Sequence, residues 1–347
     1  MDIAIWIFLS SGLFLGWSLG ANDAANVFGT AVGAKMLKFS TAAIICSIML
    51  ILGSVISGAG ASHTLGALGK VSAMGGAFTV ALSAATTVYF MTKSGLPVST
   101  SQAIVGAIIG WNLFSDMATD SSVLTKILTT WVLCPILAAV VAIILYKCVT
   151  FLLHTLRPGL FQLDNWTRIG LIFAGAFGSY SLGANNIANV MGVFVPSTPL
   201  DPLHFAGVEF SASMQLFFIG AIAISVGVFT YSKKVMLTVG DNLITMTPIS
   251  AWVVVMAHST VLFIFSSQSL SDAFTNIGLP SIPLVPVSSS QALIGAVIGI
   301  AILKRLPVQL GVLLKILMGW VVTPIMSAIS CFIGLFIVQN LFNQVVV

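Results

Sequence analysis

The stretch GANDAAN, residues 20–26, places a carboxylate and two asparagines directly after an apolar run that starts near the first residue. It returns as GANNIAN at residues 183–189, where five of the seven positions are identical. A polar motif that occurs twice in an apolar chain predicts a sequence built from two related halves.

Two longer blocks repeat in the same order. PVSTSQAIVGAIIG at 97–110 returns as PVSSSQALIGAVIG at 286–299, with ten of fourteen positions identical. LTKILTTWVLCPI at 124–136 returns as LLKILMGWVVTPI at 313–325, with eight of thirteen identical. The offset is 163 residues for the first motif and 189 for these two blocks, so the second half holds about 26 additional residues before its second block.

The composition indicates whether the surface of this chain faces water or lipid. Of 347 residues, 58% are hydrophobic and 6% are charged, and the mean hydropathy is +1.11. A soluble domain carries roughly a quarter of its residues as charged side chains. Thirteen basic and nine acidic residues cannot cover a water-exposed surface of this size. The soluble-enzyme, nucleic-acid-binding and disordered classes are therefore excluded, and the predicted partner of most of the surface is a lipid bilayer.

Apolar segments that approach the length of a membrane crossing fall into two sets of five. The first set lies near 3–19, 41–60, 76–92, 98–112 and 124–152. The second set lies near 169–182, 209–231, 248–267, 288–303 and 311–339. The fourth segment of each set is short and follows Pro-Val-Ser, which predicts a re-entrant half-helix. With an odd number per half, the second half must be inverted relative to the first.

The predicted fold is therefore an all-α polytopic membrane protein with two inverted-topology repeats and interrupted or re-entrant helices. Its parts are a first repeat at 1–152, a cytoplasmic connecting loop at 153–168 and a second repeat at 169–347.

The charges orient this fold, because cytoplasmic loops carry an excess of Lys and Arg. With both termini outside, the inner loops hold Lys35, Lys38, Lys93, Arg157, Arg168, Lys233, Lys234, Lys304 and Arg305. The outer loops hold Asp116, Asp120, Asp201, Glu209 and Asp272, with Lys70 as the exception. The positive-inside rule thus predicts that the N-terminus and the C-terminus are both outside.

The paired asparagine motifs are the candidate cation site. Asp23 adjoins a Gly- and Asn-rich break in an apolar segment, where burying a carboxylate is costly and so points to function. The alternative is that GANDAAN forms a cytoplasmic turn with Asp23 as a solvated cap, which the duplication disfavours. Glycine lets backbone carbonyls turn toward an ion, and Asn and Asp supply further oxygen ligands. The predicted cation ligands are Gly20, Ala21, Asn22, Asp23, Asn26, Gly183, Asn185, Asn186 and Asn189.

The serine-rich blocks are the candidate anion site. Each precedes an apolar helix, whose start presents free N–H groups and a partial positive charge. Two such starts related by the pseudo-twofold can converge on one tetrahedral oxyanion. Plain helix capping by Ser and Thr is the alternative interpretation. The predicted anion ligands are Ser99, Thr100, Ser101, Gln102, Ser288, Ser289, Ser290 and Gln291, together with Asn22, Asp23 and Asn185.

The two asparagine motifs and the two serine blocks, together the four motifs, resemble the inorganic phosphate transporter (PiT) family, whose GANDVAN-type signature occurs once in each inverted half. The resemblance covers nearly the whole chain. It implies a cation-coupled symporter of inorganic phosphate in the cell (plasma or inner) membrane. It also implies alternating access, a homodimer, no bound cofactor and no enzymatic activity. The chain has Gln102 and Gln291 where family members often have His, and Asn186 where they often have Asp.

The missing histidines favour Na⁺ over H⁺ as the coupling ion, because His is the usual side chain that titrates near neutral pH. The resemblance is thus nearest to the sodium-coupled branch, although the replacement at Asn186 leaves the number of bound cations open. No Lys or Arg lies in the four motifs. A phosphate dianion beside an ionised Asp23 would place about three negative charges in a low dielectric, so co-bound cations must balance them. The cation and the anion would then stabilise each other, which is the thermodynamic basis of coupling.

Other functions stay open. The nearest is an H⁺-coupled phosphate permease or a sulfate permease of the same family. Hydrogenphosphate donates a hydrogen bond at neutral pH and sulfate does not, so Asp23 as an acceptor favours phosphate. A channel needs a continuous wet pore, and the sequence shows no ring of charged residues of the kind that some channels use. An intramembrane enzyme that used Asp23, a serine and a histidine would need a histidine with the repeated motifs, and none accompanies them. The four histidines, His63, His154, His204 and His258, lie outside the motifs, and no role is expected for them.

Overall fold

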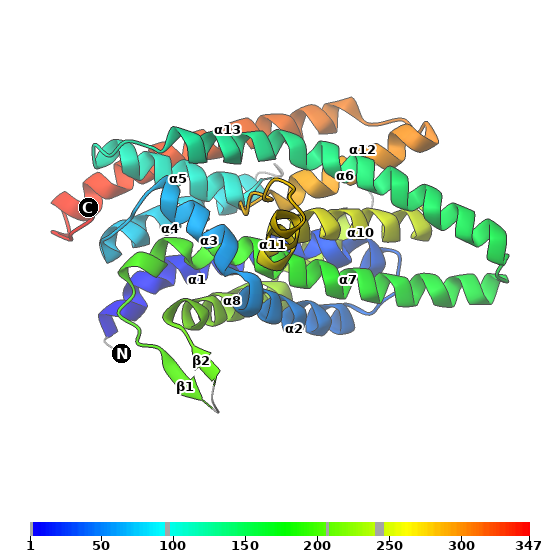
Figure 1. Ribbon diagram of the computed structural model, residues 1–347. Helices are drawn as coiled ribbons and strands as arrows, with labels where there is room; N and C mark the ends of the chain where they lie inside the picture. Colours follow the sequence, from blue (N-terminus) through cyan, green and yellow to red (C-terminus); the bar gives the residue numbers. More distant parts are fainter. Residues whose placement is uncertain (1–2, 94–97, 206–207, 240–245) are drawn as a thin grey trace.

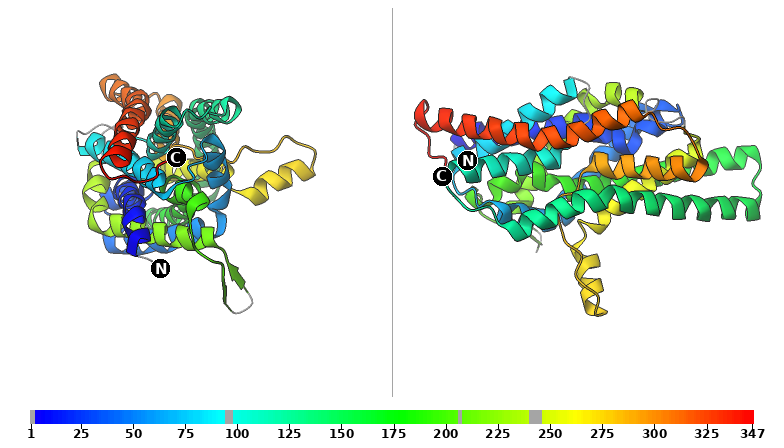
Figure 2. Two further views of the ribbon diagram at one scale, coloured as in Figure 1. Left: turned by 90° about the vertical axis from the view of Figure 1, so that its left-hand side faces the viewer. Right: turned by 90° about the horizontal axis from the view of Figure 1, so that it is seen from above.

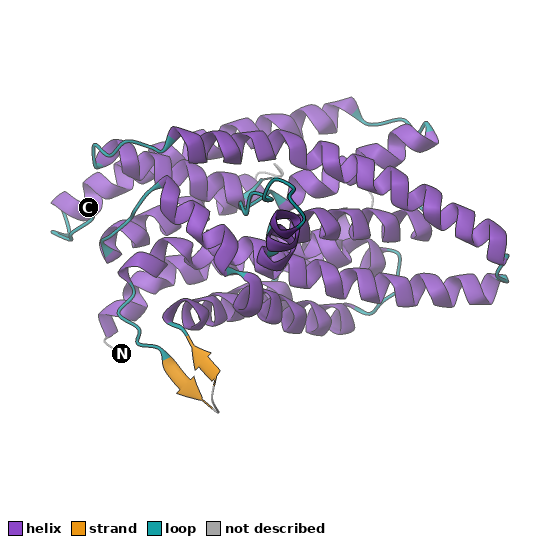
Figure 3. Ribbon diagram, in the orientation of Figure 1, coloured by secondary structure: helices purple, strands orange, loops and turns teal. Residues whose placement is uncertain are grey.

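The computed structural model describes residues 3–93, 98–205, 208–239 and 246–347, and helices dominate that part of the chain (Figure 3). The first helices are α1 (Ile3–Gly33), α2 (Phe39–Ser57), α3 (Ala59–Leu68), α4 (Met74–Lys93), α5 (Thr100–Phe114), α6 (Ser121–Leu156) and α7 (Leu160–Met191). A 3-10 turn, η1 (Gly192–Ser197), and an antiparallel hairpin, β1 (Leu203–Phe205) with β2 (Val208–Phe210), follow. The remaining helices are α8 (Ala212–Thr230), α9 (Ser232–Val239), α10 (Pro248–Ile264), α11 (Gln268–Asn276), α12 (Ser289–Lys304) and α13 (Leu310–Asn340).

Several of these helices have the length and composition of membrane spans. Within the described residues, six qualify, namely α1, α2, α4, α6, α8 and α13, and the bent pair α10–α11 makes seven if it is counted as one span. The predicted helical architecture with membrane-length segments is confirmed. Not all of the ten predicted segments meet this measure, and among those that do not are α5 and α12, whose 15 and 16 residues agree with their prediction as short half-helices. At 1.5 Å per residue such helices reach about 22–24 Å, short of a hydrocarbon core of about 30 Å.

The predicted break at the first motif is wrong, because α1 runs without interruption through residues 20–26 and α7 runs through 183–189. The glycines serve close packing instead. A Cβ on Gly20 would collide with the carbonyl of Ile224 in α8, and one on Gly183 would collide with the carbonyl of Leu50 in α2. Glycine is therefore required at these positions by the approach of a neighbouring helix.

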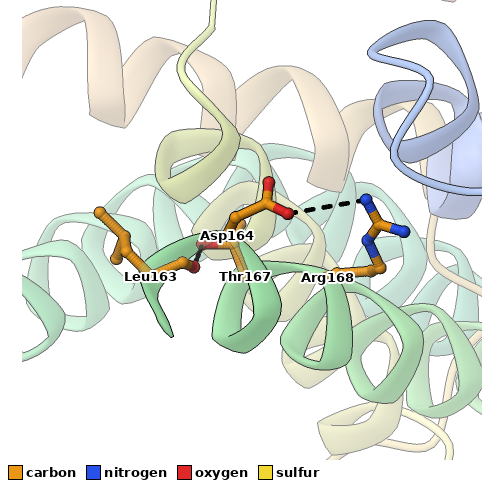
Figure 4. Close-up of polar contacts among 4 residues, drawn as sticks. All are labelled: Leu163, Asp164, Thr167 and Arg168. Atoms are coloured by element: carbon orange, nitrogen blue, oxygen red, sulfur yellow. Dashed lines mark hydrogen bonds and ion pairs between the residues drawn. The ribbon is translucent and has the colours of Figure 1, made fainter. Parts of the chain in front are cut away.

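The predicted connecting loop at 153–168 is much shorter in the structure, where only residues 157–159 separate α6 from α7. Arg157 adopts a left-handed conformation (φ 45°) and Pro158 follows, which ends α6. Residues 160–168 are polar enough for a loop but continue as the first turns of α7. There Asp164 and Arg168 form an i,i+4 ion pair of 3.6 Å (Figure 4). Both side chains are more than half exposed, so the pair adds little stability.

The predicted span at 209–231 starts too early, because Glu209 and Phe210 belong to the hairpin and α8 begins at Ala212. The Ser211 hydroxyl caps that helix by accepting a hydrogen bond of 3.2 Å from the Met214 N–H. The hairpin and α11 both project from the side of the helical bundle (Figures 1 and 2).

Helices that correspond between the two halves make corresponding contacts. α1 packs on α8 as α7 packs on α2, and α5 packs on α13 as α12 packs on α6. A Cβ on Gly106 would collide with the carbonyl of Pro324, and a Cβ on Gly295 would collide with the carbonyl of Pro135. Both the glycines and the prolines are 189 residues apart, so the repeated sequence produces the same close contact twice.

The two short helices, α5 and α12, start near the middle of the molecule and extend toward opposite ends (Figure 1). The start of α1 and the end of α13 lie at one end, and the turn between α6 and α7 lies at the other (Figures 1 and 2). This arrangement places the two repeated serine blocks against each other at the centre.

Candidate functional site

The carboxylate of the first motif faces protein rather than water. Asp23 is 2% exposed, and its Oδ2 accepts a hydrogen bond of 3.5 Å from the Thr100 hydroxyl at the start of α5. The side-chain amide of Asn22 donates to Oδ1 at 3.4 Å. Because Asp23 is buried within a continuous helix, it is not the solvated cap of a turn. It forms no ion pair with any of the described residues.

The two serine blocks begin their helices in the same way. Ser99 Oγ accepts from the Gln102 N–H and Ser288 Oγ accepts from the Gln291 N–H, each at 3.3 Å. Capping and ligand binding are thus compatible, because one cap leaves other first-turn N–H groups without a partner in the helix. Free N–H groups and the helix dipole are the features by which helix starts bind anions, so anion binding at both starts stays a prediction. Pro97, the first residue of one block, lies outside the described residues.

Hydroxyl groups join the two helix starts to each other. Ser101 Oγ donates to the Val287 carbonyl at 2.9 Å. Ser290 Oγ lies 3.4 Å from the Val98 carbonyl, to which it can donate, and 3.1 Å from Ser288 Oγ. These two hydroxyls, which the sequence assigned to the anion, therefore donate to the chain itself. Their geometry makes them a brace between the halves.

Each asparagine motif also reaches the serine block of the other half. Asn26 donates to Ser289 Oγ at 2.9 Å, and Asn189 donates to Ser101 Oγ at 2.9 Å. Asn189 donates as well to Asn186 Oδ1, again at 2.9 Å. The four motifs that the sequence singles out, separated by up to 263 residues, thus form one polar cluster, which we call the motif cluster.

Asn185 holds the segment that leads into α12. Its amide nitrogen donates to the Val285 carbonyl at 3.2 Å, and its oxygen accepts from the Val287 N–H at 3.0 Å. Because both ends of this amide have chain partners, Asn185 shapes the site. Ligand roles for Asn185, Gly20, Ala21 and Gly183 stay predictions, and the two glycines have the packing role described above.

Three buried oxygen atoms of the motif cluster have no hydrogen-bond partner within the part of the chain that the structure describes. They are Gln102 Oε1, Gln291 Oε1 and Asn189 Oδ1. An unpaired buried polar atom costs about 1–3 kcal/mol. Two of the three occupy equivalent positions in the repeats. Hard cations prefer oxygen ligands, and these atoms and the Asp23 carboxylate are oxygen atoms of that kind.

Sequence reasoning missed His258. This residue lies on α10, is fully buried, and its Nε2 is 2.9 Å from Ser289 Oγ, the atom that also accepts from Asn26. No motif surrounds His258, so the only sequence signal was a histidine inside an apolar segment. No cluster of three or more His, Cys, Asp or Glu side chains suited to a metal occurs among the described residues.

Comparison with known proteins identifies a family. The chain matches the phosphate transporter family over residues 19–331 and again over 282–345. A protein of Methanocaldococcus jannaschii named "Putative phosphate permease" is 27% identical over 96% of this chain and 97% of its own length. A protein of the same description from Thermococcus kodakarensis is 23% identical over 96% of this chain and 97% of its own length. A solved structure titled "The sodium-dependent phosphate transporter" superimposes with a TM-score of 0.74, covers 97% of this chain and 99% of its own, and is 22% identical.

Proposed function

The chain belongs to the phosphate transporter family, whose members are transporters and not enzymes, and from that premise we propose that it is a secondary active symporter of Na⁺ and inorganic phosphate. The observation that supports this proposal best is the motif cluster. It combines a buried carboxylate, two helix starts and three oxygen atoms that have no partner among the described residues. The resemblance to the phosphate transporter family stated from the motifs is confirmed by the family match.

The charge in the motif cluster supports coupling to a cation. Asp23 is negative when ionised, phosphate brings up to two further charges, and no Lys or Arg lies in the four motifs. Anion binding without a cation would place like charges together in a low dielectric. A cation held by Asp23 and amide oxygens removes that repulsion, so each ion raises the affinity for the other.

Sodium is the cation we propose, because oxygen atoms make up the available ligand set and Gln replaces His at positions 102 and 291. The structural neighbour titled as sodium-dependent supports the same choice. Coupling to H⁺ is the second candidate, and one observation favours it: the imidazole of His258 contacts Ser289 of the motif cluster. Sulfate is disfavoured as the substrate because Asp23 is an acceptor, which sulfate cannot use at neutral pH.

We further propose alternating access between two inverted repeats, in a homodimer in the cell membrane with both termini outside. Two features support the orientation. The start of α1 and the end of α13 lie at the same end of the molecule, so both are expected on the same side of the membrane (Figure 1). Lys233, from one predicted inner loop, lies 5.9 Å from the ring of Phe39, directly after Lys38 of another such loop. Basic residues from different halves thus gather in one place, as the positive-inside rule requires.

Uptake of radiolabelled phosphate into proteoliposomes tests this function. An inward Na⁺ gradient without a pH gradient should drive accumulation above equilibrium, which a channel or an enzyme cannot produce. Arsenate, a close analogue, should compete better than sulfate. Accumulation driven by a proton gradient alone, with no effect of Na⁺, would replace the Na⁺ proposal with H⁺ coupling. If sulfate displaces the labelled phosphate at lower concentrations than unlabelled phosphate does, the protein is a sulfate permease instead.

A further inference from the structure

His258 and Ser289 form a contact whose chemistry bears on anion binding. Ser289 Oγ accepts a hydrogen bond from the Asn26 amide, whose nitrogen is always a donor, and lies 2.9 Å from His258 Nε2. A hydroxyl has one hydrogen to donate and can accept two hydrogen bonds. The direction of the Ser289 hydroxyl hydrogen therefore depends on whether Nε2 of His258 carries a hydrogen.

Two arrangements are possible for a neutral imidazole. If Nε2 accepts, Ser289 donates its only hydrogen to His258, and the other ring nitrogen, Nδ1, carries a hydrogen. If Nε2 carries the hydrogen, Ser289 accepts from both Asn26 and His258, and its own hydrogen is free for a ligand. The burial of Nδ1 distinguishes the two arrangements.

Nδ1 of His258 is buried and has no hydrogen-bond partner among the described residues. An unpaired buried N–H is rarer in proteins than an unpaired acceptor. The tautomer with a bare Nδ1 and a hydrogen on Nε2 therefore suits this environment. In that tautomer Ser289 is a donor toward the motif cluster.

The other half differs at the equivalent position, Thr100, which is 189 residues before Ser289. Thr100 donates its hydrogen to Asp23, so this side of the site presents a carboxylate acceptor. Ser289 receives two donors and so presents a hydroxyl hydrogen. Hydrogenphosphate has both bare oxygens and an O–H group, and it matches a site with a donor on one side and an acceptor on the other.

We infer that His258 is a positioning residue for phosphate: it donates from Nε2 to Ser289 and thereby directs the Ser289 hydroxyl hydrogen toward the bound anion. This inference rests on the proposed phosphate-transport function. His258 acts through Ser289 and does not itself contact the ligand.

The test compares phosphate binding at saturating Na⁺ by purified full-length variants, with radiolabelled inorganic phosphate as the probe. Leucine in H258L fills similar space without a donor, whereas glutamine in H258Q places an amide nitrogen close to the position of Nε2. We expect H258L to weaken binding about tenfold or more, because a hydrogen bond to a charged group is lost, and H258Q to stay within about threefold of the natural protein. H63Q, at an exposed histidine outside the motif cluster, is the matched control and should bind normally.

A double variant separates this role from a structural one. S289A should weaken phosphate binding to a similar extent, and H258L should add little in the S289A background, because both act through one hydroxyl. Stabilisation by Na⁺ alone, measured as the shift of the apparent Tm without phosphate, should be the same in H258L and the natural protein.

Three results would overturn the inference. They are normal phosphate binding by H258L, equal loss in H258Q and H258L, or a full additional loss on adding H258L to S289A. If the natural protein itself binds no phosphate in Na⁺, the proposed function fails, which is a different outcome from failure of the role of His258.

Discussion

The Ser101 hydroxyl donates to the Val287 carbonyl over 2.9 Å, across 186 residues of chain. The reciprocal bond, from Ser290 to the Val98 carbonyl, is 3.4 Å long. Each serine lies in the first turn of one short helix and holds the segment that leads into the other. The two helix starts are therefore tied to each other, and a motion of one half against the other must either carry both helix starts with it or break these two bonds.

Replacement of Asp23 tests whether the buried carboxylate carries the coupling. We expect D23N to abolish concentrative uptake driven by Na⁺, because the amide keeps the shape but removes the negative charge that holds the cation. The chain should still insert and fold, since Thr100 can donate to the remaining oxygen. Uptake into proteoliposomes and the elution profile of the purified protein measure the two properties.

The matched control is D272N, at an exposed aspartate on α11 whose side chain accepts from Gln268 at 2.8 Å. Its uptake should be unchanged. Near-normal Na⁺-driven uptake by D23N would show that the carboxylate is not part of the cation site.

Much of the site was predictable from repetition. GANDAAN and PVSTSQ stand out against an apolar background and occur twice, so Asp23, Asn26, Asn189 and the serine blocks were identified before any geometry was known. Repetition does not predict which hydrogen-bond partner each polar atom of the site has. Ser101 was predicted to hold the anion, but its hydroxyl lies against a carbonyl of the other half, a contact that depends on how the repeats pack.

The errors in the fold have physical causes. Glycine is a poor helix former, so the pattern around Gly20 predicted a break, but a neighbouring helix requires a residue without a side chain there. The polar segment 160–168 was predicted as a loop, because hydropathy does not distinguish a loop from a helix that extends beyond the membrane. His258 was missed because a single residue without a repeat gives no pattern.

The serine brace should be unequal in strength. Ser101 both donates to Val287 and accepts from Asn189, so S101A leaves two buried polar groups without this partner. Ser290 donates over the longer distance of 3.4 Å. We expect S101A to destabilise the protein by about 2 kcal/mol and S290A by about 1 kcal/mol or less.

Thermal unfolding in detergent gives the order of the apparent Tm values. S269A, at an exposed serine on α11, is the control and should match the natural protein. A larger decrease of the apparent Tm in S290A than in S101A would contradict the predicted order of the two hydrogen bonds.

The duplicated glycine contacts predict a matched pair of defects. A Cβ on Gly106 or on Gly295 would collide with the carbonyl of a proline in the facing helix, so either helix pair must separate. We expect G106A and G295A each to lower the apparent Tm strongly and to a similar extent. G66A, which would meet no atom within 4 Å, should leave it unchanged or raise it slightly because alanine favours a helix. A silent G295A beside a damaging G106A would show that the two contacts are not equivalent.

The orientation in the membrane is open to chemical labelling. Cys148 is exposed while Cys46, Cys134 and Cys331 are buried, so a C148S background removes the reactive native thiol. D201C places a thiol ahead of the hairpin, and L160C places one beside the turn between α6 and α7, where Leu160 is 86% exposed. With both termini outside, an impermeant maleimide added to intact cells should label D201C and spare L160C. Permeabilised cells should label both, which controls for reactivity. The opposite pattern would place the termini inside and would reverse the orientation predicted from Lys and Arg, because positions 201 and 160 are predicted on opposite sides of the membrane.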